Sequence, residues 1–177
     1  TFRNPIRDPA KVAGDVGPEP LSYFARRGFY AFNVDVYVDQ DRNPFFTLAY
    51  GMLDADRGIL SLVRAGHPHP LLVRADGTTR LLRPEGYAIG LFPRAEPAVE
   101  EVRLAKGDRL LLYSDGLVDA TDPAGERFGS ERLVDLAKRH RSDTLRGLIE
   151  AIDGEVLAFR AGPAFSDDVS LLVVERT

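Results

Sequence analysis

The amino-acid sequence predicts an α+β fold in which antiparallel strands come first and helices follow. Short β-rich runs separated by polar turns fill residues 45–113. Two stretches with apolar residues at helical spacing come next, from residue 130 to residue 157. A last apolar run at residues 169–174 adds one more strand. Hairpins, then helices, then one returning strand are typical of a layered α+β domain.

Composition favours one globular domain. The chain has 177 residues, of which 44% are hydrophobic and 28% are charged, and it contains no cysteine. It therefore has no disulfide and no thiolate metal site, and no apolar run reaches the ~18 residues that a membrane-spanning helix needs. A formal net charge of -4 argues against a nucleic-acid partner. We expect a cytoplasmic protein that binds another protein or a small molecule, without contact to nucleic acid or membrane.

Prolines and glycines interrupt the first forty residues, so long regular elements are not expected there. The interrupting residues are Pro5, Pro9, Gly14, Gly17, Pro18 and Pro20. Residues 21–27 suit a short helix, and residues 33–38 alternate polar and apolar side chains as a strand does.

From residue 44 onward the sequence predicts a meander of antiparallel strands. Three pairs of β-rich runs are each joined by a turn that contains glycine: 45–53 with 59–64, 70–74 with 78–82, and 101–104 with 108–113. The turn residues Asp76 and Gly77 are a strong hairpin signal. Gly107 stands where the third turn needs a positive φ.

Two helices and an interior strand are expected after residue 116. Ser130 is a suitable N-cap for the first helix, which ends with Lys138 and Arg139. The second helix opens near residue 143, and its apolar positions recur at helical spacing: Leu145, Leu148, Ile149, Ile152, Val156 and Leu157. The nearly continuous apolar run at 169–174 is typical of a strand inside a sheet.

Carboxylates stand at the ends of two of the predicted strands. Asp115 follows the apolar run 110–113, and Asp167 with Asp168 precedes the run 169–174. If these runs are neighbouring antiparallel strands, the end of one lies beside the start of the other. Oxygen donors suit Mg²⁺ or Mn²⁺, and two such ions about 3.5–4 Å apart can clamp a phosphoryl group during hydrolysis.

Each acidic site also has a purely structural interpretation. Asp115 with Gly116 can be a simple turn, and the pair Asp167 and Asp168 can be a solvated strand entry. Their combination favours a shared cation, because clustered carboxylates repel one another unless a positive charge neutralises them. Gly116 leaves room for the close approach of a ligand.

Four sequence blocks resemble the bacterial PPM-type serine/threonine phosphatases of the SpoIIE and RsbU class. The blocks are residues 46–54, 65–72, 107–117 and 167–171, in the same order as in that class. The resemblance implies an αββα sandwich of two antiparallel sheets flanked by helices, with a binuclear Mg²⁺ or Mn²⁺ centre. It implies metal ligands at Asp115 and Asp167, which would also be the catalytic residues, with Asp168 in a supporting role and Gly116 beside the metals.

The same resemblance implies a biological role. Such enzymes dephosphorylate phosphoserine or phosphothreonine on a partner protein, often an anti-anti-sigma factor in stress or sporulation signalling. An N-terminal sensor domain or a second copy of the chain is a further candidate partner.

The chain departs from the class near its N-terminus. Relatives carry an upstream Gly-Asp block that supplies a bridging Asp and a backbone carbonyl to the metals. Residues Gly14 and Asp15 resemble that block, but Pro18 follows where a helix should continue. We expect residues 1–177 to form a single domain that is truncated or degenerate at its N-terminus, with two ions only where the site is complete.

Other candidate residues have simpler explanations. His67 and His69 could bind a metal from one side of an extended loop, but Pro68 and Pro70 favour a stiff loop that His67 orders by hydrogen bonding. His140 lies among basic residues at a predicted helix end. Three further arginines could contact phosphate, although scattered arginines are usually solvated: Arg26, Arg27 and Arg94.

Three functions are compatible with these features. The leading one is metal-dependent phosphomonoester hydrolysis without a covalent enzyme intermediate. The second is a signalling or docking module that keeps the phosphatase fold without a working metal centre. The third, an aspartyl-phosphate phosphotransferase of the haloacid-dehalogenase kind, needs an early Asp-x-Asp loop in an alternating β/α chain, and Asp115 comes late and after hairpins.

Overall fold

The computed structural model describes residues 29–37, 45–92, 96–160 and 168–177, with only the backbone described for 29–37. The elements are β1 (Phe29–Tyr37), β2 (Phe45–Asp54), β3 (Ile59–Ala65), β4 (Leu71–Val73), β5 (Thr79–Leu81), β6 (Val99–Arg103), β7 (Arg109–Tyr113), α3 (Asp115–Val118), α4 (Gly129–Arg139), α5 (Leu145–Arg160) and β8 (Leu171–Glu175). The predicted strand at 33–38 is confirmed for residues 33–37, which belong to β1, whereas residue 38 lies outside the described residues. The predicted helix at 21–27 lies outside the described residues.

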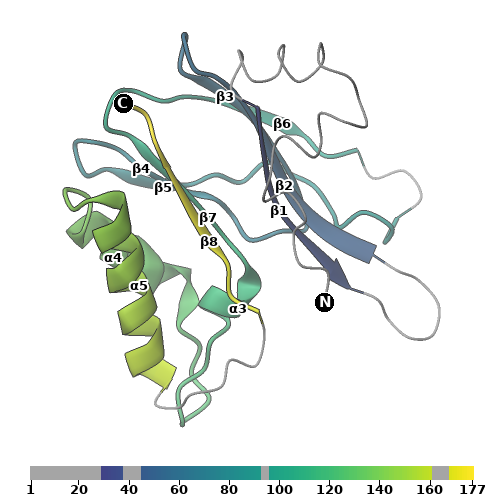
Figure 1. Cartoon of the computed structure of the whole chain (residues 1–177). Helices are drawn as coiled ribbons and strands as arrows, with labels where there is room; N and C mark the ends of the chain where they lie inside the picture. The colour runs from purple at the N-terminus through teal and green to yellow at the C-terminus, as the bar shows by residue number, and fades with distance from the viewer. Residues whose placement is uncertain (1–28, 38–44, 93–95, 161–167) are drawn as a thin grey trace, which may run out of the picture.

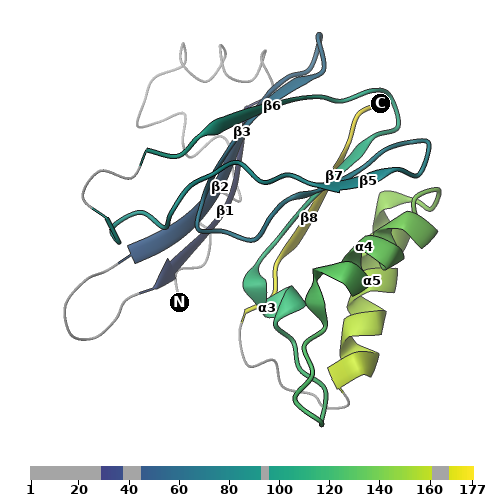
Figure 2. The ribbon, with the colours of Figure 1, turned by 180° about the vertical axis from the view of Figure 1, so that it is seen from behind.

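The strands form two antiparallel four-stranded sheets, with the orders β1-β2-β3-β6 and β5-β4-β7-β8. Helices α4 and α5 cover the outer face of the second sheet, and the first sheet lies on its other side (Figures 1 and 2). The predicted α+β arrangement of layered sheets and helices is therefore confirmed. None of the described helices is long and apolar enough to cross a bilayer.

The expectation of a simple meander is wrong, because the chain changes sheets between consecutive strands. The hairpins β2–β3 and β4–β5 form as predicted, but β3 and β4 lie in different sheets. Likewise, the turn at Gly107, with a φ of 80°, joins β6 of the first sheet to β7 of the second. A turn signal shows that the chain reverses, but it does not show which sheet receives the next strand.

Strand β7 is buried along its whole length because it contributes to both apolar layers. Leu111 and Tyr113 belong to the cluster beneath α4 and α5. Leu110 and Leu112 belong to the cluster between the two sheets. Alternate side chains of a strand point to opposite faces, so an apolar run of this kind fits a strand packed on both sides. The backbone at the end of β7 is therefore held rigidly from both faces of the sheet.

Helix α4 begins earlier than expected. Its N-cap is Phe128, and Ser130 lies within the first turn, so the predicted Ser130 cap is wrong. Phe128 is 1% exposed and packs edge-on against Phe159 at a centroid distance of 5.4 Å. Core packing of this ring, rather than side-chain capping, sets where α4 starts.

Helix α5 agrees with its predicted pattern, whereas the last strand differs. The hydroxyl of Thr144 accepts a hydrogen bond from the Gly147 N–H at 3.0 Å, which stabilises the start of α5. Strand β8 was expected inside a sheet, but among the described strands it is an edge strand beside β7. Leu172 is accordingly 44% exposed.

Candidate functional site

The end of β7 and the start of β8 meet, as the sequence predicts. In the antiparallel register Tyr113 pairs with Leu171. Beyond that pair, the Ser114 hydroxyl donates to the Asp168 carbonyl at 3.0 Å and accepts from the Ser170 N–H at 2.9 Å. The backbones at Asp115 and Asp168 are thus tied together through one buried serine. Asp167 lies outside the described residues.

Asp115 is the first residue of the short helix α3 and is half-buried. Its carbonyl accepts the Asp119 N–H at 2.7 Å, and the next two residues, Gly116 and Leu117, are buried. The side chain of Asp115 therefore extends from a position that is fixed on one side by β7 and on the other by this helical turn.

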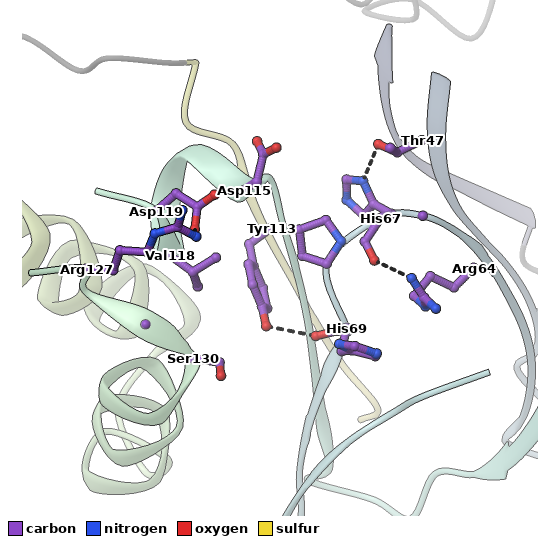
Figure 3. Close-up of a pocket in the computed structure, with 13 residues that line it drawn as sticks. Thr47, Arg64, His67, His69, Tyr113, Asp115, Val118, Asp119, Arg127 and Ser130 are labelled. Carbon is purple, nitrogen blue, oxygen red and sulfur yellow. Dashed lines mark hydrogen bonds and ion pairs between the residues drawn. The ribbon is translucent and has the colours of Figure 1, made fainter. Parts of the chain in front are cut away.

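Asp115 lines a pocket of about 470 Å³ to which both sheets and the α3–α4 segment contribute. Figure 3 shows Asp119 and Arg127 on the α3–α4 side of this pocket and His67 with Thr47 on the opposite side. The side chains that line it and are labelled there are Thr47, Arg64, His67, His69, Tyr113, Asp115, Val118, Asp119, Arg127 and Ser130.

The loop from Gly66 to Pro70 forms one wall of the pocket and is held by side chains from three strands. Thr47 Oγ1 and His67 Nδ1 lie 3.2 Å apart in a buried hydrogen bond. Arg64 Nη1 donates to the His67 carbonyl at 3.0 Å, and the Tyr113 hydroxyl donates to the His69 carbonyl at 2.8 Å. These contacts support the interpretation that His67 orders the loop by hydrogen bonding.

Burial sets the charge states of two groups in this wall. Burial raises the pKa of Tyr113 to about 12, so its hydroxyl stays a hydrogen-bond donor at neutral pH. Burial, together with the positive charges of Arg64 and Arg83, lowers the pKa of His69 from its ordinary value of 6.5. The His69 imidazole is therefore uncharged near pH 7.

The side chains at the site offer oxygen atoms, which are the type of ligand that a hard cation prefers. Asp115 and Asp119 line the pocket with carboxylate side chains, and Asp168 lies just before β8, with its backbone carbonyl bonded to Ser114. Mg²⁺ and Mn²⁺ prefer such oxygen ligands. Within the part of the chain that the structure describes, no group of three or more His, Asp or Glu side chains is arranged to hold a metal. The predicted ligand Asp167 and the weaker candidate Asp15 both fall outside that part.

Several residues that line the pocket do not stand out in the sequence, among them Asp119 and Arg127. Asp119 stands four residues after Asp115, and this i,i+4 spacing would have placed both on one face had a helix been predicted there. No pattern in the sequence indicates that Arg127 lines the pocket, because its position depends on the folded turn between residues 119 and 128. The arginines that were considered as phosphate contacts, at positions 26, 27 and 94, lie outside the described residues.

Comparison with protein-family models gives a match to the family described as Stage II sporulation protein E (SpoIIE), over residues 29–177. The phosphoserine phosphatase RsbP of Bacillus subtilis is 30% identical over 137 residues, which are 77% of this chain and 32% of RsbP. The chain spans only 21% to 43% of the length of three curated relatives that it matches.

Solved structures agree with the sequence matches. A crystal structure of the RsbU and RsbW domains of a Mycobacterium tuberculosis protein has a TM-score of 0.61 and 29% identity, covering 74% of this chain and 37% of that one. The PP2C phosphatase domain of SpoIIE from Bacillus subtilis has a TM-score of 0.64, covering 73% of this chain and 37% of that one, and its 19% identity bears on the fold alone.

These matches confirm the expected sandwich of two antiparallel sheets with flanking helices. They leave no place for the haloacid-dehalogenase alternative, which needs a parallel α/β sheet. The family model covers the whole segment from β1 to β8, including Asp115 at the end of β7 and the acidic pair before β8. The chain belongs to the SpoIIE family of PPM-type phosphatase domains.

Proposed function

We propose that this protein is a metal-dependent phosphatase that hydrolyses phosphoserine or phosphothreonine on a partner protein. The observation that carries the proposal is that Asp115 lines the pocket directly after Ser114, which is hydrogen-bonded to the segment before β8, in a chain of the SpoIIE family. RsbP, whose name describes it as a phosphoserine phosphatase, supports the substrate class.

In this proposal Asp115 and Asp167 bind the metal ions, and Asp168 supports a ligand or a water. Bound Mg²⁺ or Mn²⁺ would supply Lewis-acid polarisation of the phosphoryl group and a more acidic water. The chain's own contribution is rigidity. The buried strand β7 and the hydrogen bonds of Ser114 fix the backbone of both acidic segments, while Gly116 keeps the first turn of α3 free of a side chain.

The partner and the setting follow from the same family relationship. We propose a phosphorylated anti-anti-sigma factor as the substrate and the cytoplasm as the place of reaction. The described sheets and helices would act as one catalytic domain, controlled by a sensor domain or by pairing with a second copy of the chain.

The direct test is Mn²⁺-dependent release of phosphate from p-nitrophenyl phosphate and from a phosphoserine peptide by the whole protein. Replacing Asp115 by Asn should lower the rate by about a hundredfold or more, because one ligand carboxylate is lost. The matched control is Asp153→Asn on the exposed side of α5, which should leave the rate unchanged. Equal rates for Asp115→Asn and the unaltered protein would refute the proposed mechanism.

A second candidate is a signalling or docking module without catalysis. It is favoured by the departure of the sequence from the Gly-Asp block of the class, since Pro18 follows Gly14 and Asp15 where a helix should continue. Under this alternative the whole protein would neither hydrolyse the phosphoserine peptide nor take up Mn²⁺ at a ratio of two ions per chain.

A further inference from the structure

The pocket that holds Asp115 also carries cationic groups for which the proposed metal chemistry has no use. These groups are the guanidinium side chains of Arg64 and Arg127. Arg64 is already held by backbone carbonyls, with Nη1 donating to His67 at 3.0 Å and Nε donating to Pro84 at 3.2 Å. His69 also lines the pocket, but its imidazole is uncharged near neutral pH, so Arg127 is the cation of this pocket that is best placed to meet an anionic substrate.

The backbone at Arg127 is fixed by a network of hydrogen bonds within residues 119–128. The Asp122 carboxylate accepts the N–H groups of Ala124 and Glu126, both at 2.9 Å. Thr121 pairs with Arg127 in an antiparallel bridge, and Arg132 Nη1 donates to the Arg127 carbonyl at 2.7 Å. The Arg127 side chain therefore starts from a well-defined point at the edge of the pocket (Figure 3).

The guanidinium of Arg127 can change partners at low cost. Its Nη1 lies 2.9 Å from Asp119 Oδ1, and the two side chains are 71% and 50% exposed. Exposed ion pairs of this kind contribute only about 0.2–1 kcal/mol. A phosphate monoester carries more negative charge than a carboxylate, and its oxygens match the planar fork of a guanidinium in two parallel hydrogen bonds.

The start of α4 adds positive potential on the same side. Gly129 and Ser130, the first two residues of the helix, line the pocket beside Arg127. The N-cap residue Phe128 has no oxygen in its side chain, so it cannot accept the N–H groups of the first turn. An anion in the pocket would be favoured by both the guanidinium and the helix N-terminus.

We propose that Arg127 binds the phosphoryl oxygens of the substrate, and that Asp119 holds the guanidinium in place until the substrate arrives. This inference rests on the proposed phosphatase function, because it assigns the residue that recognises the phosphate beside Asp115. Arg127 acts by direct contact, whereas Asp119 is a positioning residue that competes with the phosphate for the same donor.

The first test measures binding without metal and without turnover. Inorganic phosphate is titrated into the whole protein in the presence of EDTA, and binding is followed by NMR chemical shifts. Arg127→Ala should weaken phosphate binding by about tenfold or more, since two charge-assisted hydrogen bonds are lost, and Arg127→Lys by less. Asp119→Asn should strengthen binding severalfold, because the competing carboxylate is neutralised.

A matched control pair lies on α5, where Arg146 Nη1 and Glu150 Oε1 are 3.7 Å apart and both side chains are exposed. Arg146→Ala and Glu150→Gln should leave phosphate binding unchanged. A purely structural role for the Arg127–Asp119 pair would give equal effects in Arg127→Ala and Asp119→Asn. Unchanged phosphate binding in Arg127→Ala, weaker binding in Asp119→Asn, or no binding by the unaltered protein would each overturn the proposal.

Hydrolysis of the phosphoserine peptide with Mn²⁺ separates the two proposals. If the unaltered protein is active, Arg127→Ala should raise the KM about tenfold, and an unchanged kcat/KM would overturn the role of Arg127. If phosphate binding depends on Arg127 while the unaltered protein does not hydrolyse the peptide, the binding site stands and the phosphatase function fails.

Discussion

Asp108 shows how a single buried carboxylate can tie two turns together. Its side chain is 2% exposed and accepts hydrogen bonds from the N–H groups of Ala75 at 3.0 Å and Ala105 at 2.7 Å. Arg74 Nη1 lies 2.5 Å from Asp108 Oδ2. These contacts join the β4–β5 hairpin to the segment that carries the chain from the first sheet into β7.

The ionised form of Asp108 should stabilise the fold in a pH-dependent way. Burial alone would raise the pKa of Asp108, but the hydrogen bonds from Ala105, Ala75 and Arg74 outweigh it and lower the pKa below the ordinary 3.8. The folded pKa is then lower than the unfolded one, so the stabilisation is complete above the unfolded pKa. It is lost as the pH falls through the folded pKa.

Urea unfolding of Asp108→Asn measures this contribution. The free energy of unfolding at pH 7 should fall by about 1–3 kcal/mol, because two N–H groups and a guanidinium lose a charged acceptor. The loss should begin to shrink below about pH 4, where the carboxyl of the unfolded chain becomes protonated, and should vanish as the pH falls through the lower pKa of the folded protein. A loss of equal size at pH 7 and pH 3, or no loss at either pH, would contradict this account. Asp153→Asn serves as the exposed control.

At the scale of elements, the loop between β3 and β4 decides where the pocket wall lies. Gly66 has a φ of 71°, and its N–H donates to the Gly86 carbonyl at 3.0 Å. A Cβ at this position would lie 2.8 Å from the Cβ and 2.9 Å from the Cα of Ala88. Both the backbone conformation and the space therefore require glycine here.

Replacing Gly66 by Ala should disturb the pocket through this loop. We expect the free energy of unfolding to fall by about 1–3 kcal/mol, because of the strained φ and the contact with Ala88. Displacement of the loop should also shift the NMR signals of the His67 ring, since its hydrogen bond to Thr47 depends on the loop position. Gly154→Ala, in α5 with open space around it, is the control that should not destabilise the protein. Unchanged His67 signals in Gly66→Ala would argue against this role of the loop.

The sequence predicts elements well where periodicity and turn chemistry are strong. The hairpins β2–β3 and β4–β5 and the helix α5 follow directly from alternation, Asp-Gly turns and helical spacing. Prediction from the sequence fails where tertiary packing determines where an element begins or which sheet a strand joins. The burial of Phe128 moves the start of α4, and the assignment of β6 and β7 to different sheets depends on contacts that no local pattern contains.

At the scale of the whole molecule, the site lies at the end of a strand that contributes side chains to both apolar layers. Leu110 and Leu112 pack between the sheets, and Leu111 and Tyr113 pack beneath the helices, so β7 is held on both faces. Asp115 is placed at the end of this strand, next to the start of β8. This convergence could be predicted from two apolar runs with acidic ends.

Other parts of the site could not be found in that way. Arg127 reaches the pocket only through the folded turn at residues 119–128, and Thr47 reaches it from the opposite sheet. Tertiary packing places both residues in the pocket with Asp115, and no local sequence pattern around either of them indicates this position. The acidic pair and the family blocks identify the chemistry, whereas the fold identifies the residues that surround it.

Calorimetric titration of the whole protein with Mn²⁺ shows whether the paired ends of β7 and β8 form a cation site at all. We expect saturable Mn²⁺ binding that Asp115→Asn weakens by at least about tenfold, because a ligand is lost, and that Asp153→Asn leaves unchanged. Binding of the same strength in Asp115→Asn and the unaltered protein, or no binding in either, would contradict the proposed cation site.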